Sequence, residues 1–157
     1  MTIKTSFVLI SIIAALTSCT SKTDNTVSTP SARSVVGTWQ LITATVVEKG
    51  DTTVTDYTKN RSFIKVINDT HFAFLQHDLT KGNDSSAVFT AGGGTYSLTD
   101  SAYAEHLTYC SDRNWEGTDF NFTITLKNDT LIQSGVETVE QAGVNRVNTE
   151  TYIRVKP

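Results

Sequence analysis

The chain has 157 residues, of which 38% are hydrophobic and 18% are charged, and its net charge is −3. This length suits one globular domain, and so small a charge excludes an extended acidic tail or a nucleic-acid-binding surface. Threonine occurs 27 times against two prolines and one methionine, and β-branched residues favour strands. A long helical bundle and a collagen-like or disordered chain are therefore excluded.

The N-terminus has the pattern of a signal sequence. An apolar run from Phe7 to Leu16, broken only by Ser11, follows Lys4. Ten residues are too few to cross a hydrocarbon core of ~30 Å as a helix, so this run is not a membrane anchor. It ends in Leu-Thr-Ser-Cys at residues 16–19, which resembles a bacterial lipobox, cleaved before its cysteine. The alternative is an ordinary secretory signal with a chance cysteine.

The lipobox implies that residues 1–18 are a lipoprotein signal peptide and that Cys19 becomes a lipidated N-terminus. Two or more acyl chains anchor a protein stably, at ~0.8 kcal/mol per buried CH₂. We therefore expect a membrane partner through Cys19 and a place in the bacterial cell envelope, in the outer membrane, on its periplasmic or surface face. The mature chain has 139 residues after loss of the first 18, and loss of Lys4 changes the charge from −3 to −4.

Residues 19–34 are rich in Ser and Thr and contain Pro30, without apolar periodicity. Such a segment is a flexible tether, reaching ~20 Å as a random coil. The folded domain is expected over residues 35–157. Cys110 is its one thiol, which excludes an intramolecular disulfide. We expect Cys110 to be a packed residue, with a catalytic nucleophile as the alternative.

Three residue pairs that lie between runs of β-formers predict hairpins. They are Asn-Asp at residues 68–69 and 128–129, and Asp-Ser at residues 100–101. Asn and Asp tolerate the positive φ that two-residue turns require. Each hairpin then has one face rich in aromatic residues and Leu, and an opposite face of small polar residues. The predicted partners are Ile67 with Thr70, Lys65 with Phe72, Phe63 with Phe74, Leu98 with Tyr103, Tyr96 with Glu105, Leu126 with Leu131, and Ile124 with Gln133.

Further strands are expected at residues 35–47, 52–57, 86–90 and 147–155, with a short one near Val136. The total is about nine or ten antiparallel strands with turns every 8 to 14 residues, a spacing that fits both a sandwich and a closed barrel.

The two ends of the domain favour the barrel. Gly37-Thr38-Trp39 opens the first strand and Arg154 lies near the end of the last, which resembles the lipocalins of the calycin superfamily. The run from Gly92 to Tyr96, followed by residues 103–106, also resembles small lipocalin-like bacterial lipoproteins of unknown function. The resemblance implies an all-β fold, a single antiparallel up-and-down barrel of about 8–10 strands. In it, Trp39 plugs the closed end beneath Arg154 in a cation–π contact. The sequence differs from the lipocalin pattern in two features. The Thr-Asp-Tyr motif, which lipocalins carry well past mid-chain, lies at residues 55–57, and the usual disulfide is missing.

The aromatic faces, turned inward, supply the candidate ligand-binding residues. Lys65 and Glu105 are the charges on this face, and a buried charge needs a partner, water or a ligand. Two interpretations stay open: an apolar cavity with a few polar groups that orient a small molecule, or an interior filled by side chains. The candidates are Phe63, Lys65, Phe72, Phe74, Tyr96, Tyr103, Glu105, Tyr109, Phe120 and Phe122.

Other chemistry has weaker support. His71, His77 and His106 match no metal-ligand spacing and are expected at the surface, and no cofactor is predicted. The glycines at 92–94 precede a strand-like run, so they predict a turn or bulge and not a phosphate site.

We therefore expect a lipid-anchored envelope protein whose barrel binds a small, partly apolar ligand without catalysis. One alternative is an accessory or scaffold lipoprotein with a filled barrel, which binds a protein partner through its outer surface or loops, for example an apolar patch around Trp115. Another is an enzyme that uses Glu105 with Tyr96 or Tyr103 for acid–base chemistry.

Overall fold

The computed structural model describes residues 34–156; the signal sequence, Cys19 and all of the tether but Ser34 lie outside the described residues. Nine strands and two short 3-10 helices make up the described chain. In chain order these are β1 (Gly37–Glu48), β2 (Asp51–Asp56), β3 (Arg61–Ile67), β4 (His71–Asp78), β5 (Phe89–Thr99), β6 (Ala102–Cys110), η1 (Arg113–Trp115), β7 (Thr118–Lys127), β8 (Thr130–Val139), η2 (Glu140–Ala142) and β9 (Val144–Arg154).

Eight of these strands form a closed antiparallel barrel. Each strand from β3 to β9 pairs with the next, β1 pairs with β3, and the pairing of β1 with β9 closes the ring. Strand β2 stands outside the ring, because it pairs with residues 43–48 of β1 and with no other described strand. The expected all-β, lipocalin-like barrel is thus confirmed.

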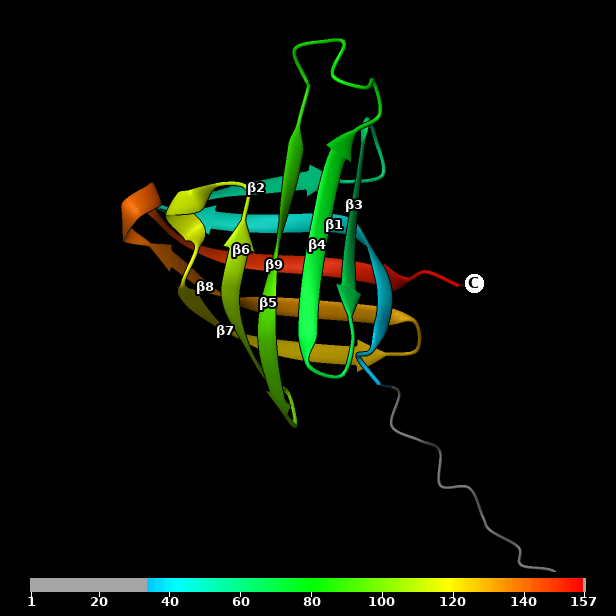
Figure 1. The fold of residues 1–157 in the computed structure, drawn as a ribbon, viewed down its shortest axis with the longest axis vertical. Helices are drawn as coiled ribbons and strands as arrows, with labels where there is room; N and C mark the ends of the chain where they lie inside the picture. Colours follow the sequence, from blue (N-terminus) through cyan, green and yellow to red (C-terminus); the bar gives the residue numbers. More distant parts are fainter. Residues whose placement is uncertain (1–33, 157) are drawn as a thin grey trace, which may run out of the picture. The chain divides into compact units, whose positions relative to one another are not determined.

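The barrel has an open end and a closed end. Strands β3, β4 and β5 run across β7, β8 and β9 in Figure 1, and the β1–β2 hairpin, η1 and η2 all lie at one end. The described chain enters at the other end, beside Trp39. No helix among residues 34–156 has the length and apolar character to span a membrane.

Two hairpins have the predicted register. Leu98 pairs with Tyr103, and Leu126 with Leu131. Asp100 and Asn128 adopt φ of 55° and 56°, the left-handed conformation that made Asp and Asn good turn residues.

The first hairpin differs from its predicted register. Ile67 pairs with Phe72 and not with Thr70. Asn68 is the cause, because its side chain accepts hydrogen bonds from the Thr70 and His71 amides at 2.9 and 2.7 Å, and its amide donates to the His71 carbonyl at 3.0 Å. The turn therefore centres on Asp69 and Thr70, one residue later. The partners shift by two residues, which keeps each side chain on its predicted face.

The nine strands agree with the expected number, but two of the expected divisions between strands are absent. The run expected at 86–90 joins the next one as β5, and the short strand near Val136 belongs to β8. The glycines at 92–94 continue β5 and face a bulge in β6, where Gly93 pairs with Tyr109 and Gly94 with Leu107. This bears out the bulge that the glycines predicted.

The bulge also overturns one site prediction. Simple alternation places Tyr109 inside, but the extra residue Thr108 reverses the alternation, and Tyr109 is 69% exposed. Tyr109 is therefore not a lumen residue.

Gly94 is required at this bulge, since a Cβ there would overlap the His106 carbonyl oxygen and lie 2.8 Å from the Thr108 nitrogen. We expect Gly94→Ala to lower the free energy of unfolding by about 1–3 kcal/mol in urea titration, because backbone atoms must move apart. Thr95→Ala, at the exposed next position, is the control. Equal stability of the two variants would contradict a tight bulge.

Candidate functional site in the barrel lumen

The predicted aromatic face lines the lumen. Of the ten candidates, the structure places nine on the inner wall, and their role as ligand contacts remains a prediction. Phe63 stacks on Phe74 with ring centroids 5.8 Å apart, and Phe120 on Phe122 at 6.0 Å. The inward candidates are Phe63, Lys65, Phe72, Phe74, Tyr96, Tyr103, Glu105, Phe120 and Phe122.

A buried ammonium lies at the centre of this wall. Lys65, 3% exposed, contacts Glu105 Oε1 at 2.5 Å and donates to Gln133 Oε1 at 2.7 Å. Its Nζ also lies 5.2 and 5.3 Å from the ring centroids of Phe72 and Tyr103, within cation–π range. The two charges expected to need partners thus pair with each other, as one of the alternatives stated.

The Lys65–Glu105 pair disfavours the acid–base alternative. Burial, followed by the charge of Glu105, raises the pKa of Tyr103 far above its ordinary value. A phenol in this setting keeps its proton at neutral pH, and the Glu105 carboxylate is bound by Lys65. Neither group is poised for proton transfer.

A second cluster of polar residues lies on the inner wall nearer the open end, on β8 and β9. Arg146 Nε contacts Glu137 Oε2 at 2.6 Å, and Asn148 Nδ2 donates to Glu137 Oε1 at 2.8 Å. That bond fixes the amide orientation of Asn148, since a carboxylate only accepts hydrogen bonds. The other amide atom, Asn148 Oδ1, is buried and has no hydrogen-bond partner among the described residues.

Glu150 is the next inward residue of β9. It accepts a hydrogen bond from the Tyr152 hydroxyl at 2.6 Å, and no described Lys, Arg or His nitrogen lies within 4.0 Å of its carboxylate. Burial raises the pKa of Glu150, and the charge of Lys65 and the Tyr152 bond oppose that rise. The lumen therefore holds one carboxylate without an ion pair.

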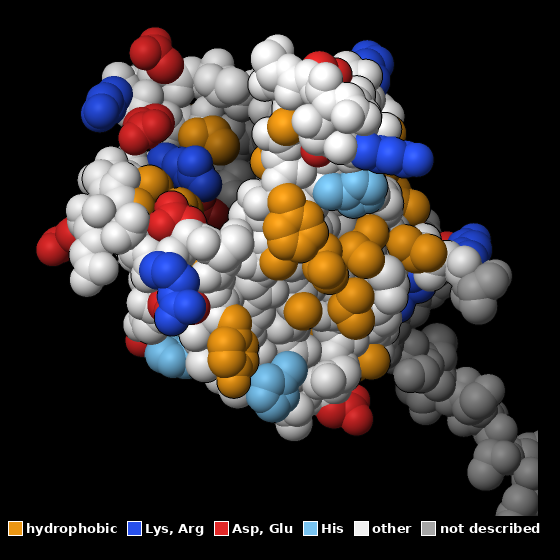
Figure 2. All heavy atoms as spheres, turned by 45° about the horizontal axis from the view of Figure 1, so that its top comes forward, with side chains coloured by type: hydrophobic (Ala, Val, Ile, Leu, Met, Phe, Trp, Pro, Cys, Tyr) orange, Lys and Arg blue, Asp and Glu red, His pale blue; other side chains and the backbone are white. Residues whose placement is uncertain are grey.

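The open end has a hollow whose walls carry both apolar and charged side chains. Figure 2 shows a hollow in the left half of the view, with hydrophobic, basic and acidic side chains on its walls. Arg61 lies 5.6 Å from the Tyr57 ring centroid, and Arg146 5.6 Å from that of Trp115. Trp115 is partly buried against Phe120, with centroids 6.0 Å apart. The expected exposed patch around Trp115 is therefore wrong, because this indole packs at the mouth.

Asp78 holds the loop over residues 79–88 at the same end. Its carboxylate accepts hydrogen bonds from the amides of Thr80, Gly82 and Val88 at 3.0, 2.8 and 3.1 Å, and from the Thr80 hydroxyl at 2.8 Å. These bonds, led by that from Gly82, lower the pKa of Asp78. Asp78 thus holds this loop in place, and the hydrogen bonds from the loop stabilise its negative charge.

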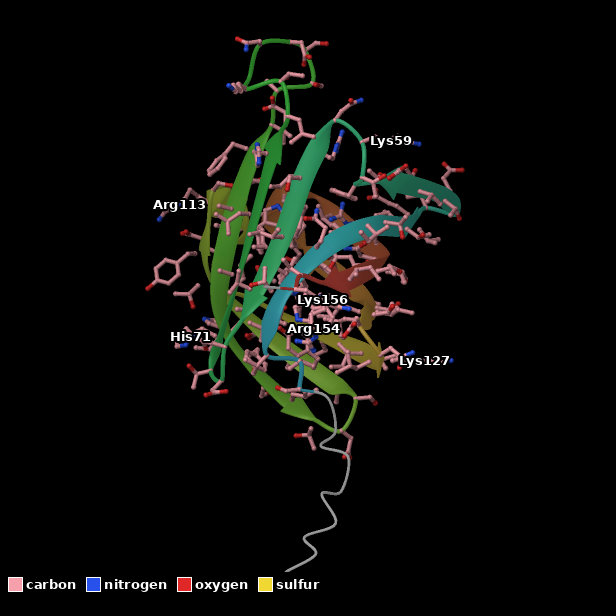
Figure 3. The ribbon with its side chains drawn as sticks, turned by 90° about the vertical axis from the view of Figure 1, so that its right-hand side faces the viewer. Lys59, His71, Arg113, Lys127, Arg154 and Lys156 are labelled. Atoms are coloured by element: carbon pink, nitrogen blue, oxygen red, sulfur yellow. The ribbon has the colours of Figure 1, made fainter. Side chains whose placement is uncertain are left out.

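The closed end has the predicted plug. Trp39 is fully buried and its Nε1 donates to the Val35 carbonyl at 2.8 Å. The Arg154 guanidinium carbon lies 4.1 Å from the Trp39 ring centroid, so the expected stacking is present. Arg154 Nη1 and Nη2 also donate to the carbonyls of Val36 and Ser34, at 2.8 and 2.6 Å. In Figure 3, Arg154 and Lys156 lie together beside the start of β1.

The histidines and Cys110 stay outside the lumen site. His71, His77 and His106 are exposed, as expected. Among residues 34–156, no three His, Cys, Asp or Glu side chains lie close enough to hold a metal ion. Burial raises the pKa of the Cys110 thiol, which weakens it as a nucleophile.

An apolar patch lies on the outer face of β4, β5 and the end of β6. Leu75, Phe89 and Tyr109 are 42%, 70% and 69% exposed, and they flank a hollow lined by Ala73 and Ala91. Figure 2 shows hydrophobic side chains gathered on the right half of the view. The bulge at Thr108 creates this patch by turning Tyr109 outward.

Sequence reasoning missed most of the polar lumen. It assumed that inward positions are apolar, whereas β8 and β9 carry their polar residues inward. One signal was available, because the predicted pairing of Ile124 with Gln133 already placed a Gln on the inner face. Continuing that alternation along both strands identifies the missed residues, which are Gln133, Glu137, Arg146, Asn148, Glu150 and Tyr152.

The raised pKa of Glu150 predicts a pH effect. A folded pKa above the ordinary value of 4.5 means that the folded state binds the proton more tightly, so stability falls as pH rises through the folded pKa. Glu150→Gln keeps an acceptor for the Tyr152 hydroxyl and removes the charge. We expect its free energy of unfolding to match the parent near pH 4 and to exceed it at pH 7, in urea titrations at both values. A variant that is less stable at pH 7 would contradict this account.

Fold and lumen together define a lipocalin-like, eight-stranded antiparallel β-barrel protein with a polar cluster inside an aromatic wall. A family model described as a domain of unknown function, DUF4488, matches residues 34–157, and the chain belongs to this family. No curated protein matches the chain.

Proposed function

We propose that this protein is a lipid-anchored lipoprotein of the bacterial envelope, in the outer membrane, whose barrel binds a small, partly apolar molecule through its open end and does no catalysis. An unsatisfied polar group on the inner wall carries the proposal. Asn148 is 94% buried, yet its Oδ1 has no hydrogen-bond partner among the described residues. A buried acceptor without a donor costs about 1–3 kcal/mol, a cost that a bound ligand removes.

The surroundings of Asn148 suit a partly apolar ligand. Aromatic rings cover much of the inner wall, and polar groups occupy a few positions on β3, β4, β6, β8 and β9. A mostly apolar wall with a few fixed polar groups is the usual composition of a small-molecule site.

A titration with N-phenyl-1-naphthylamine, a neutral apolar fluorescent probe, tests this proposal on the full chain. Val144→Trp enlarges an inward side chain near the mouth, whereas Val147→Trp makes the same change at an outward, 41% exposed position of β9. We expect the parent and Val147→Trp to bind the probe alike, and Val144→Trp to bind at least tenfold more weakly. Absence of probe binding, or equal binding by the two variants, contradicts a lumen site.

The outer apolar patch supports a second candidate function, an accessory lipoprotein that binds a protein partner. Isolated exposed apolar residues are common, but contiguous ones often mark interaction surfaces. If Tyr109→Ser abolishes probe binding and Val144→Trp does not, this outer surface is the site and the lumen is filled.

A further inference from the structure

The Lys65 site shows how this lumen holds an ammonium group. One carboxylate (Glu105), one amide oxygen (Gln133 Oε1) and the faces of aromatic rings surround Nζ. The Tyr152 ring also contributes, with its centroid 5.9 Å from Nζ. An ammonium has three donors and no acceptor, and this set of groups offers it two oxygen acceptors and the faces of aromatic rings.

The same kinds of group recur nearer the mouth without an ammonium. Glu150 supplies a carboxylate with no ion pair, and Asn148 supplies a buried amide oxygen with no donor. Both point inward from β9, two residues apart, which separates their Cα atoms by ~6.6 Å. Glu150 lies opposite Gln133, one of the Lys65 ligands, so the two sites adjoin.

Aromatic rings complete the second site. Tyr57 packs edge-on against Phe63, with centroids 5.7 Å apart. Burial and then the charge of Glu150 raise the pKa of Tyr57. A desolvated cation beside an aromatic face gains about 2 kcal/mol.

The charges of the inner wall also favour a cationic ligand. Lys65 pairs with Glu105 and Arg146 with Glu137, while Arg61 lies over Tyr57 and the loop amides satisfy Asp78. Glu150 is left as the negative charge that the described residues do not pair. A bound anion would meet this carboxylate, whereas a bound cation would compensate it.

We propose that the lumen ligand is an organic amine, whose ammonium group Glu150 and Asn148 Oδ1 hold and whose apolar part packs on the aromatic wall. This inference rests on the proposed function, since it assigns the ligand class of the same lumen. A metal ion is disfavoured, because Ca²⁺ takes six to eight oxygen ligands and only two protein groups converge here.

Calorimetric titrations of the full chain at pH 7.5 with decylamine, decanol and decanoate test the inference. The three probes share a chain length and differ in head-group charge, positive, neutral and negative. We expect decylamine to bind at least tenfold more tightly than decanol, and decanoate to bind most weakly. Glu150→Gln is expected to abolish the preference for the amine and to leave decanol binding unchanged. Glu140→Gln, which removes the same charge from exposed η2, is expected to keep the preference.

The other outcomes separate the two proposals. Equal binding of decylamine and decanol by the parent, or tighter binding of decanoate, overturns the amine assignment and leaves the lumen site standing. Binding of none of the three probes overturns both proposals. An amine preference that survives Glu150→Gln also overturns the assignment, because another group must then hold the cation.

Discussion

Replacing Lys65 by methionine is expected to lower the free energy of unfolding by about 3–5 kcal/mol, the usual cost of leaving one member of a buried ion pair alone. Methionine matches the length of the lysine stem, so the loss of charge dominates the effect. The variant leaves Glu105 without its cation and Gln133 without its donor. It also removes the positive charge that opposes the raised pKa of Glu150. Urea titration at pH 7 measures the loss.

Two further variants isolate the cause of that loss. Adding Glu105→Gln to Lys65→Met removes the orphaned charge, and we expect it to recover more than half of the lost stability. Lys127→Met makes the same change at an exposed position and is expected to alter stability by less than about 0.5 kcal/mol. A Lys65→Met loss no greater than that of Lys127→Met would contradict a buried, paired ammonium.

Replacing Trp39 by alanine is expected to cost about 3–5 kcal/mol, because it empties the largest fully buried position at the closed end. The change also leaves the Val35 carbonyl without its donor and the Arg154 guanidinium without the ring beneath it. Thermal and urea unfolding both report the loss.

The stacking itself is measured by a double-mutant cycle. Trp39→Leu and Arg154→Met, alone and together, are expected to show a coupling of about 0.5–2 kcal/mol, the range of cation–π pairs. Additive effects of the two substitutions would show that Arg154 acts through its bonds to the Val36 and Ser34 carbonyls and its ion pair with Asp129, and not through the Trp39 ring.

Local chemistry was enough to predict antiparallel strands and the face on which most residues lie, whereas the choice of a barrel over a sandwich came from the resemblance to lipocalins. Asn and Asp at turns and the strict alternation of β7, with Phe120 and Phe122 inward, are properties of neighbouring residues. The error at Asn68 arose because its side chain bonds the next turn of the backbone, a competition that spacing does not reveal. Its consequence was small, since a shift by two residues keeps the faces.

Tyr109 shows where alternation fails. Gly94 permits close approach of β6. The single extra residue, Thr108, reverses the inward and outward alternation of the residues that follow it in β6. The glycines indicated a bulge, but the partner strand that would carry it could be identified only from the three-dimensional pairing.

The polar lumen was the least predictable part. An inward Glu, Arg or Asn on β8 and β9 breaks the apolar-inward rule. Arg146 and Asn148 bond Glu137 across this strand pair, and Glu150 bonds Tyr152 of its own strand. Lys65 and Gln133 are 68 residues apart in the chain, a separation at which sequence pattern carries no information on contact. Buried polar groups that break the folding pattern are common at functional sites.

Mapping a bound probe by NMR tests the central claim most directly. Amide chemical shifts of the full chain, recorded during titration with N-phenyl-1-naphthylamine, locate the probe residue by residue. The account predicts that the largest changes fall on the inner-wall positions around Gln133, Asn148 and Glu150. Changes confined to the outer face around Ala73, Ala91 and Tyr109, with an undisturbed lumen, would contradict it.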